Sequence, residues 1–119
     1  MKQRVKTVSY LARAEFDIKN GSYDLVALPS GAEVVRCALE VVGEVTAGKA
    51  SVGFKDDDRN TNFFLDNISL ANSKHNTSAK CCTVLDTKVI SAKVIDASGN
   101  ARGVLRVLYF LPSETEVEY

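Results

Sequence analysis

The sequence has no tryptophan, one histidine and three cysteines in 119 residues. Jelly-roll enzymes of the cupin type hold a metal ion with several histidines and a carboxylate, and a single histidine does not suffice for such a site. The cysteines show no C-x-x-C spacing, which excludes a zinc knuckle and a thioredoxin motif. We therefore expect no cofactor.

The one histidine, His75, lies in a polar stretch without an acidic neighbour in sequence. A catalytic base needs a nucleophile and an orienting group beside it. We interpret His75 as a solvated loop residue, with a catalytic base as the alternative. Gly43, Gly48 and Gly53 do not have the spacing of a phosphate-binding loop. The sequence thus predicts a protein that is not an enzyme.

An excess of charge of either sign is also missing. Fifteen Lys and Arg residues balance fifteen Asp and Glu residues, so the formal net charge is zero. A chain of this kind lacks the broad basic face of a non-specific nucleic-acid binder, and we expect no direct contact with nucleic acid. No apolar run is long enough to span a bilayer, and the basic start leads into no apolar segment, so we expect no membrane contact and no secretory signal.

The cysteines predict reduced thiols in a protein made in the cytoplasm. Cys37 falls on the apolar side of a strand, where it acts as a small buried hydrophobe. Cys81 and Cys82 are adjacent, and neighbouring residues of a strand point to opposite faces. The alternative is an intersubunit disulfide from whichever of these two cysteines faces outward.

Most of the chain alternates apolar and polar residues with a period of two, which is typical of half-buried strands. Between Glu33 and Val42 one face is predicted to contact the core, and its residues are Val35, Cys37, Leu39 and Val41. The turn Leu28-Pro29-Ser30-Gly31 precedes this strand, because Pro fixes φ and Gly accepts a positive φ. After Val42 we expect a loop at Gly43–Lys49.

The last segment is interpreted as a hairpin. The turn residues Asp96–Asn100 are predicted to join a strand at Lys88–Ile95 to a strand at Arg102–Leu111. In the final strand one row is Leu105, Val107, Tyr109 and Leu111, and the opposite row is Val104, Arg106, Leu108 and Phe110. A strand that is apolar on both faces is covered on both sides. The second row is therefore predicted to form an oligomer interface, unless the N-terminal strand of the same chain covers it.

Together these patterns predict an all-β fold, an antiparallel β-sandwich or jelly roll of about eight short strands. We divide the chain into a basic N-terminal arm with the first strand at 1–21, a β-sandwich core at 22–112 and an acidic C-terminal tail at 113–119.

Three contiguous aspartates, Asp56, Asp57 and Asp58, are the best candidates for a metal site, because Ca²⁺ prefers several oxygen ligands on a flexible loop. Their spacing lacks the alternation and the glycine of an EF-hand loop, and Lys55 and Arg59 neutralise the charge locally. We therefore interpret this segment as a solvated acidic turn, with a weak ion site as the alternative.

The two ends of the chain carry opposite charge. Such charges pair within a subunit or between neighbours, or only solvate the ends. The alternation of basic and apolar residues near the start also suits an arm that docks on a partner by strand addition. The residues of this candidate arm are Arg4, Val5, Lys6 and Val8.

Three blocks taken together resemble small structural proteins of tailed bacteriophages and prophages, of the capsid decoration (cement) or head-fibre type. They are Leu28–Val35, Ala50–Phe54 with the following Asp-rich turn and Phe63–Leu65, and Asp96–Val104 leading into the apolar last strand. The resemblance covers about residues 22–112 and rests on turn placement and strand rhythm.

The resemblance implies a non-enzymatic virion protein, made in the bacterial cytoplasm, that binds the outer head surface as an oligomer and stabilises the shell. It implies that the protein binds further copies of itself to form a trimer. The other partner it implies is the major capsid protein or another virion protein. A tail, neck or baseplate component is the first alternative. A carbohydrate- or ligand-binding β-sandwich module is the second, although the absence of tryptophan counts against it.

Overall fold

The computed structural model describes residues 2–55, 57–112 and 114–118. The regular elements in these ranges are nine β-strands, which confirms the predicted all-β class. They are β1 (Lys2–Lys6), β2 (Ser9–Asp17), β3 (Gly21–Leu28), β4 (Glu33–Phe54), β5 (Leu65–Ser69), β6 (His75–Thr77), β7 (Cys82–Thr83), β8 (Lys88–Phe110) and β9 (Glu114–Glu118). No helix in these ranges has the length and apolar character needed to cross a membrane.

The two longest strands, β4 and β8, form the centre of a seven-stranded antiparallel sheet. They pair from Glu33 opposite Phe110 to Phe54 opposite Ile90. Along β8, β2 pairs with the C-terminal half and β3 with the N-terminal half. Along β4, β6 and β7 pair with the first half and β5 with the second half.

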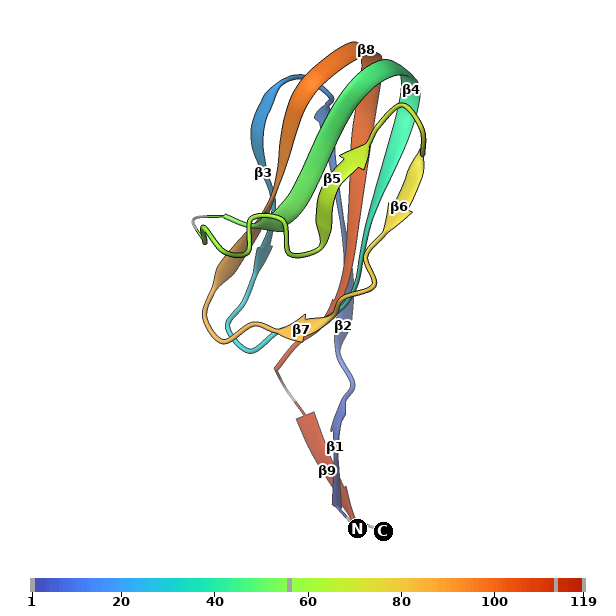
Figure 1. The fold of residues 1–119 in the computed structure, drawn as a ribbon. Coiled ribbons are helices and arrows are strands. Elements are labelled where there is room, and N and C mark those ends of the chain that lie inside the picture. The colour runs from blue at the N-terminus through green and yellow to red at the C-terminus, as the bar shows by residue number, and fades with distance from the viewer. Residues whose placement is uncertain (1, 56, 113, 119) are drawn as a thin grey trace.

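This sheet folds over on itself halfway along β4 and β8 (Figure 1). One layer then has the order β2, β8, β4 and the short strands β6 and β7, and the other has the order β3, β8, β4 and β5. The two layers face each other across the core, which confirms the antiparallel β-sandwich.

Two predicted chain breaks are wrong. The segments interpreted as a loop at Gly43–Lys49 and as a hairpin turn at Asp96–Asn100 are paired with each other at the bend. They continue β4 and β8, which are therefore 22 and 23 residues long instead of short. Register shifts between Val45 and Lys49 mark β-bulges there, and bulges bend a strand without reversing it.

Gly43 and Gly99 permit the close approach of the two strands at this bend. Both have positive φ, 116° and 125° respectively. A Cβ atom on Gly43 would lie 2.7 Å from the carbonyl oxygen of Asn100, and one on Gly99 would collide with the carbonyl oxygen of Glu44. Turn-forming residues thus occur in mid-strand because the bend needs the same backbone freedom as a turn.

The hydrophobic core lies between the two layers. Its largest fully buried side chains are Leu28, Leu39, Leu70, Ile90, Leu105, Val34, Val52, Val94, Val107 and Cys37. Among the described residues no polar or charged side chain is buried. The interior is therefore held together by apolar packing, at roughly 1.5–3 kcal/mol for each large side chain removed from water.

The predicted core face of β4 is confirmed for Cys37, Leu39 and Val41, which are buried. The prediction is wrong for Val35, which is 46% exposed. A register shift against β8 between Val34 and Arg36 moves the alternation by one residue, so that Val34 contacts the core instead.

The turn before β4 is confirmed. Gly31 has a φ of 85°, and the amide of Ala32 donates a hydrogen bond to the carbonyl oxygen of Pro29 at 3.2 Å. A Cβ atom on Gly31 would lie 2.9 Å from Cβ of Pro112, so the turn lies directly against the chain leaving β8.

The two ends of the chain form a separate antiparallel ribbon of β1 and β9. It extends away from the sandwich, with both termini at its far end (Figure 1). At its base the amide of Leu111 donates to the carbonyl oxygen of Val8 at 2.8 Å. The division into arm, sandwich and tail stays a prediction, and β2 of the first segment is part of the main sheet.

Candidate assembly surfaces

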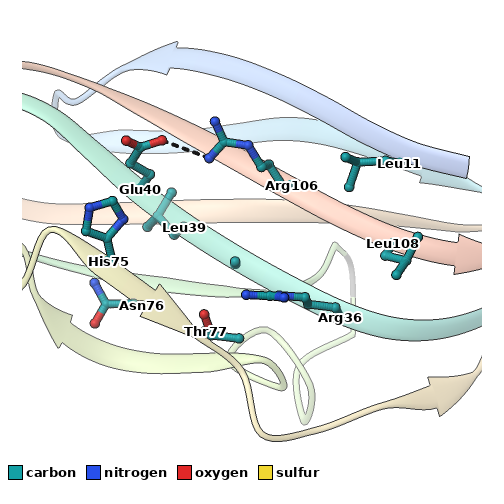
Figure 2. A pocket seen from close by; sticks show the side chains of 10 residues that line it. Leu11, Arg36, Leu39, Glu40, His75, Asn76, Thr77, Arg106 and Leu108 are labelled. Atoms are coloured by element: carbon teal, nitrogen blue, oxygen red, sulfur yellow. Dashed lines mark hydrogen bonds and ion pairs between the residues drawn. The ribbon is translucent and has the colours of Figure 1, made fainter.

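A groove runs over the outer face of the layer formed by β2, β8, β4 and β6 (Figure 2). The strand register places Leu11 of β2 opposite Leu108 of β8, and Leu108 opposite Arg36 of β4. The groove has a volume of about 480 Å³. It is lined by Leu11, Arg36, Ala38, Leu39, Glu40, His75, Asn76, Thr77, Arg106 and Leu108.

An ion pair joins two strands within the groove. The Arg106 guanidinium donates from Nη1 to Oε1 of Glu40 at 2.8 Å, and both side chains are partly exposed. This hydrogen bond is the main reason that the pKa of Glu40 is lowered, and the positive charges of Arg106, His75 and Arg13 act in the same direction. Glu40 and Arg106 therefore largely neutralise each other.

Arg36 in the same groove has no such partner. Within 2–55, 57–112 and 114–118 no hydrogen bond or ion pair engages its guanidinium. Leu11, on the other side of Leu108 in the same groove, is 64% exposed, which is unusual for a leucine on a strand of a sandwich. The groove thus combines exposed apolar surface with one uncompensated positive charge.

The four predicted interface residues, Val104, Arg106, Leu108 and Phe110, belong to this layer. Val104 is only 3% exposed, so it offers little surface to a partner, whereas Leu108 and Phe110 are half-buried. The alternative that the N-terminal strand covers this face is wrong, because β2 pairs with β8 side by side and extends the sheet. The sequence analysis did not single out Leu11. Ala12 and Ala14 lie on the inward face of β2, so Leu11 lies on the opposite, outward face.

The predicted docking arm lies in the ribbon and at its base. Arg4, Val5 and Lys6 are in β1, and Val8, which is 41% exposed, follows it. The register places residues of opposite charge across from each other: Lys2 and Glu118, Arg4 and Glu116, Lys6 and Glu114. The two ends of the chain therefore pair as strands, and the pairing of their charges stays a prediction.

A second exposed apolar feature is the loop between β7 and β8. Leu85 in this loop is 82% exposed, more than any other large hydrophobic side chain among the described residues. The loop is nevertheless held firmly. The amide of Gly31 donates to the carbonyl oxygen of Val84 at 2.6 Å, and Ser30 Oγ donates to the carbonyl oxygen of Leu85 at 2.7 Å. No sequence pattern pointed to Leu85.

In the acidic turn, the Asp57 carboxylate binds neighbouring residues of the same turn. Asp57 accepts hydrogen bonds from the amide of Arg59 at 3.3 Å and from Nδ2 of Asn60 at 2.9 Å. The bond from Asn60 is the main reason that the pKa of Asp57 is lowered. Asp58 is exposed, and Asp56 lies outside the described residues. No group of three potential metal ligands occurs in the part of the chain that the structure describes.

Three cysteines and His75 are the other chemically reactive side chains that the sequence analysis singled out. Cys37 is buried, and burial, with a smaller effect of Cys82, raises the pKa of its thiol to about 12. Cys81 is exposed and Cys82 half-buried, as expected for adjacent residues on opposite faces. His75 is exposed at the edge of the groove, opposite Glu40 in the register.

Comparison with known proteins identifies the family of the chain. The chain is 55% identical to a protein in the acid-stable capsid of Helicobacter pylori bacteriophage KHP30, with a TM-score of 0.89 and 100% of both chains covered. This chain belongs to the same family of phage capsid proteins. It is accordingly a structural component of the virion.

More distant capsid proteins share the fold of this family. A chain of the cyanophage Pam1 capsid matches with a TM-score of 0.71 at 16% identity, covering 87% of this chain and 85% of that chain. A chain of the capsid of Ralstonia phage GP4 matches with a TM-score of 0.63 at 15% identity, covering 91% and 87%. No protein-family model and no curated protein matches the chain.

Proposed function

We propose that this protein is a capsid decoration (cement) protein that binds the outer surface of the phage head and stabilises the shell without catalysing a reaction. The observation that carries this proposal is the match over the full length of a chain in the acid-stable KHP30 capsid. The fold matches to two further capsids favour the head over the tail, neck or baseplate.

The proposal assigns self-association to the outer face of the β2–β8–β4–β6 layer. Leu11 and Leu108 are apolar side chains at the surface of the groove, and Phe110 lies at the end of the same strand as Leu108. Burying such residues between copies removes apolar area from water. We propose a trimer, in which several weak contacts with the shell add up through effective concentration.

The ribbon of β1 and β9 is proposed as the part that docks on the shell, through Arg4, Val5, Lys6 and Val8. An isolated two-stranded ribbon is at best marginally stable in water, so contacts with a partner would stabilise it. Its strands have free edges in the described residues, and a free edge accepts a further strand by β-augmentation.

Stabilisation of the shell is proposed to extend to acid. The described residues bury no polar or charged side chain, so no carboxylate in the core has to be protonated when the pH falls. The capsid of the KHP30 phage is itself described as acid-stable.

The test uses phage heads assembled without this protein, to which the purified full-length chain is added. We expect regular binding on the outer head surface by electron cryomicroscopy, together with a higher temperature of head opening at neutral and at acidic pH. A variant lacking residues 1–6 should remain folded and bind much more weakly. Binding only to tails, or binding that leaves the opening temperature unchanged, would overturn the proposal.

A further inference from the structure

The groove and the loop between β7 and β8 have complementary features. In the groove, Leu108 lies between Leu11 and Arg36, and Arg36 has no partner in the described part of the chain. In the loop, the exposed Leu85 precedes Asp86, and no ion pair or hydrogen bond engages the Asp86 carboxylate in the residues that the structure covers. Each surface therefore has exposed apolar area next to a charge, and the two charges are opposite.

The loop does not fill the groove of its own chain. Leu85 is 82% exposed and Leu11 is 64% exposed, so both remain accessible when the chain is folded. The hydrogen bonds from Gly31 and Ser30 fix the loop to the turn before β4. Because the loop is already ordered, little conformational entropy is lost when it binds.

The size of the groove is compatible with the side chains of the loop. Pockets that take small ligands have volumes of roughly 300–1,000 Å³. The groove, at about 480 Å³, has space for two side chains. The guanidinium of Arg36 in the groove, which is unpaired within the described residues, attracts an acidic group. A charge pair of this kind selects the partner and the register of an interface.

Resting on the oligomer of the proposed function, we propose that Leu85 and Asp86 of one copy insert into the groove of the next copy. Asp86 then pairs with Arg36 of its neighbour, and Leu85 packs on Leu11 and Leu108. The contact is heterologous, because groove and loop are different surfaces. Repeated around an axis, a heterologous contact closes into a ring, as a trimer requires.

The test is a charge exchange in the full-length chain. Arg36→Asp and Asp86→Arg are made singly and together, and Asp66→Arg, a charge reversal at an exposed residue of β5, is the matched control. The molar mass is measured by light scattering over a range of concentrations, and folding is checked by thermal melting. We expect each single exchange to raise the dissociation constant of the oligomer about tenfold or more, and the double exchange to restore most of the loss.

Two outcomes would overturn the pairing: single exchanges that assemble like the wild type and the control, or a double exchange no better than the singles. A wild type that is monomeric at all concentrations overturns both this pairing and the proposed oligomer. Binding to heads is measured separately. A variant that still forms the wild-type oligomer but no longer binds heads would affect only the proposed binding to the head. It would leave the pairing between copies intact, so the two proposals fail in distinguishable ways.

Discussion

The ring of Phe16 lies over Gly103, its direct partner in the register between β2 and β8. A Cβ atom on Gly103 would come within 2.5 Å of Cζ and 2.6 Å of Cε1 of Phe16. Phe16 is 8% exposed and also contacts Tyr23, with ring centroids 5.0 Å apart. The aromatic ring thus occupies the space left by the missing side chain and covers the glycine backbone, as aromatic residues do for glycines in other sheets.

The first prediction concerns this contact. Gly103→Ala is expected to lower the free energy of unfolding by about 1–3 kcal/mol, because the new methyl group displaces a packed ring. Urea denaturation measures the change. In the Phe16→Leu background the same substitution should cost less, because leucine leaves more space. Equal costs in both backgrounds would show that the ring is not the obstacle.

The second prediction concerns pH. The hydrogen bond from Arg106 lowers the pKa of Glu40 below its ordinary value of 4.5. The pair therefore stabilises the fold above the unfolded-chain pKa, and this contribution disappears as the pH falls through the lowered value. Arg106→Gln should raise the pKa of Glu40, as measured by carboxyl NMR titration. Arg13→Gln, which removes a weaker cause, should raise it less. A Glu40 pKa that is unaffected by Arg106→Gln would contradict the assignment.

A third prediction tests the outer face of the sandwich. Leu108→Asp places a charge among the apolar residues of the groove and is expected to weaken self-association about tenfold or more, since interface cores exclude charge. Ile95→Asp, a change on the same strand near the bend at a residue that is 39% exposed, is the control and should assemble normally. Light scattering measures both. Normal assembly of Leu108→Asp would show that this face does not bind a second copy.

The acidic turn provides a fourth prediction. Asp57→Ala removes the acceptor for Arg59 and Asn60 and is expected to lower the melting temperature. Asp58→Ala should leave the melting temperature nearly unchanged, as for most surface substitutions. Millimolar calcium should leave the melting temperature unchanged, because the Asp57 carboxylate is already engaged. Stabilisation by calcium that Asp57→Ala abolishes would instead reveal an ion site.

The fifth prediction concerns the thiols. With a pKa of about 12 and no exposure, Cys37 should react with a thiol reagent at pH 8 only after unfolding. Cys81 is exposed and should react first, and Cys81→Ser should remove this fast phase. Electrophoresis without reductant is expected to show monomers only. A dimer that Cys81→Ser abolishes would support the intersubunit disulfide.

The alternation of apolar and polar residues was sufficient to predict an all-β sandwich, because strand side chains alternate between faces whatever the partners of the strand are. It placed Cys37, Leu39 and Val41 in the core, and it identified the turn before β4. It also separated the two rows of the last strand, of which the row with Leu105 and Val107 contacts the core.

Only the tertiary structure decided how the strands continue and which surfaces remain open. The residues at 43–49 and 96–100 favour a turn locally, and the pairing of β4 with β8 converts both into one shared bend. Likewise a single bulge reverses Val34 and Val35 relative to the later residues of β4, because one inserted residue shifts the alternation between the two faces. The exposure of Leu85 depends on hydrogen bonds from a turn more than fifty residues away in sequence, so no local pattern contains it.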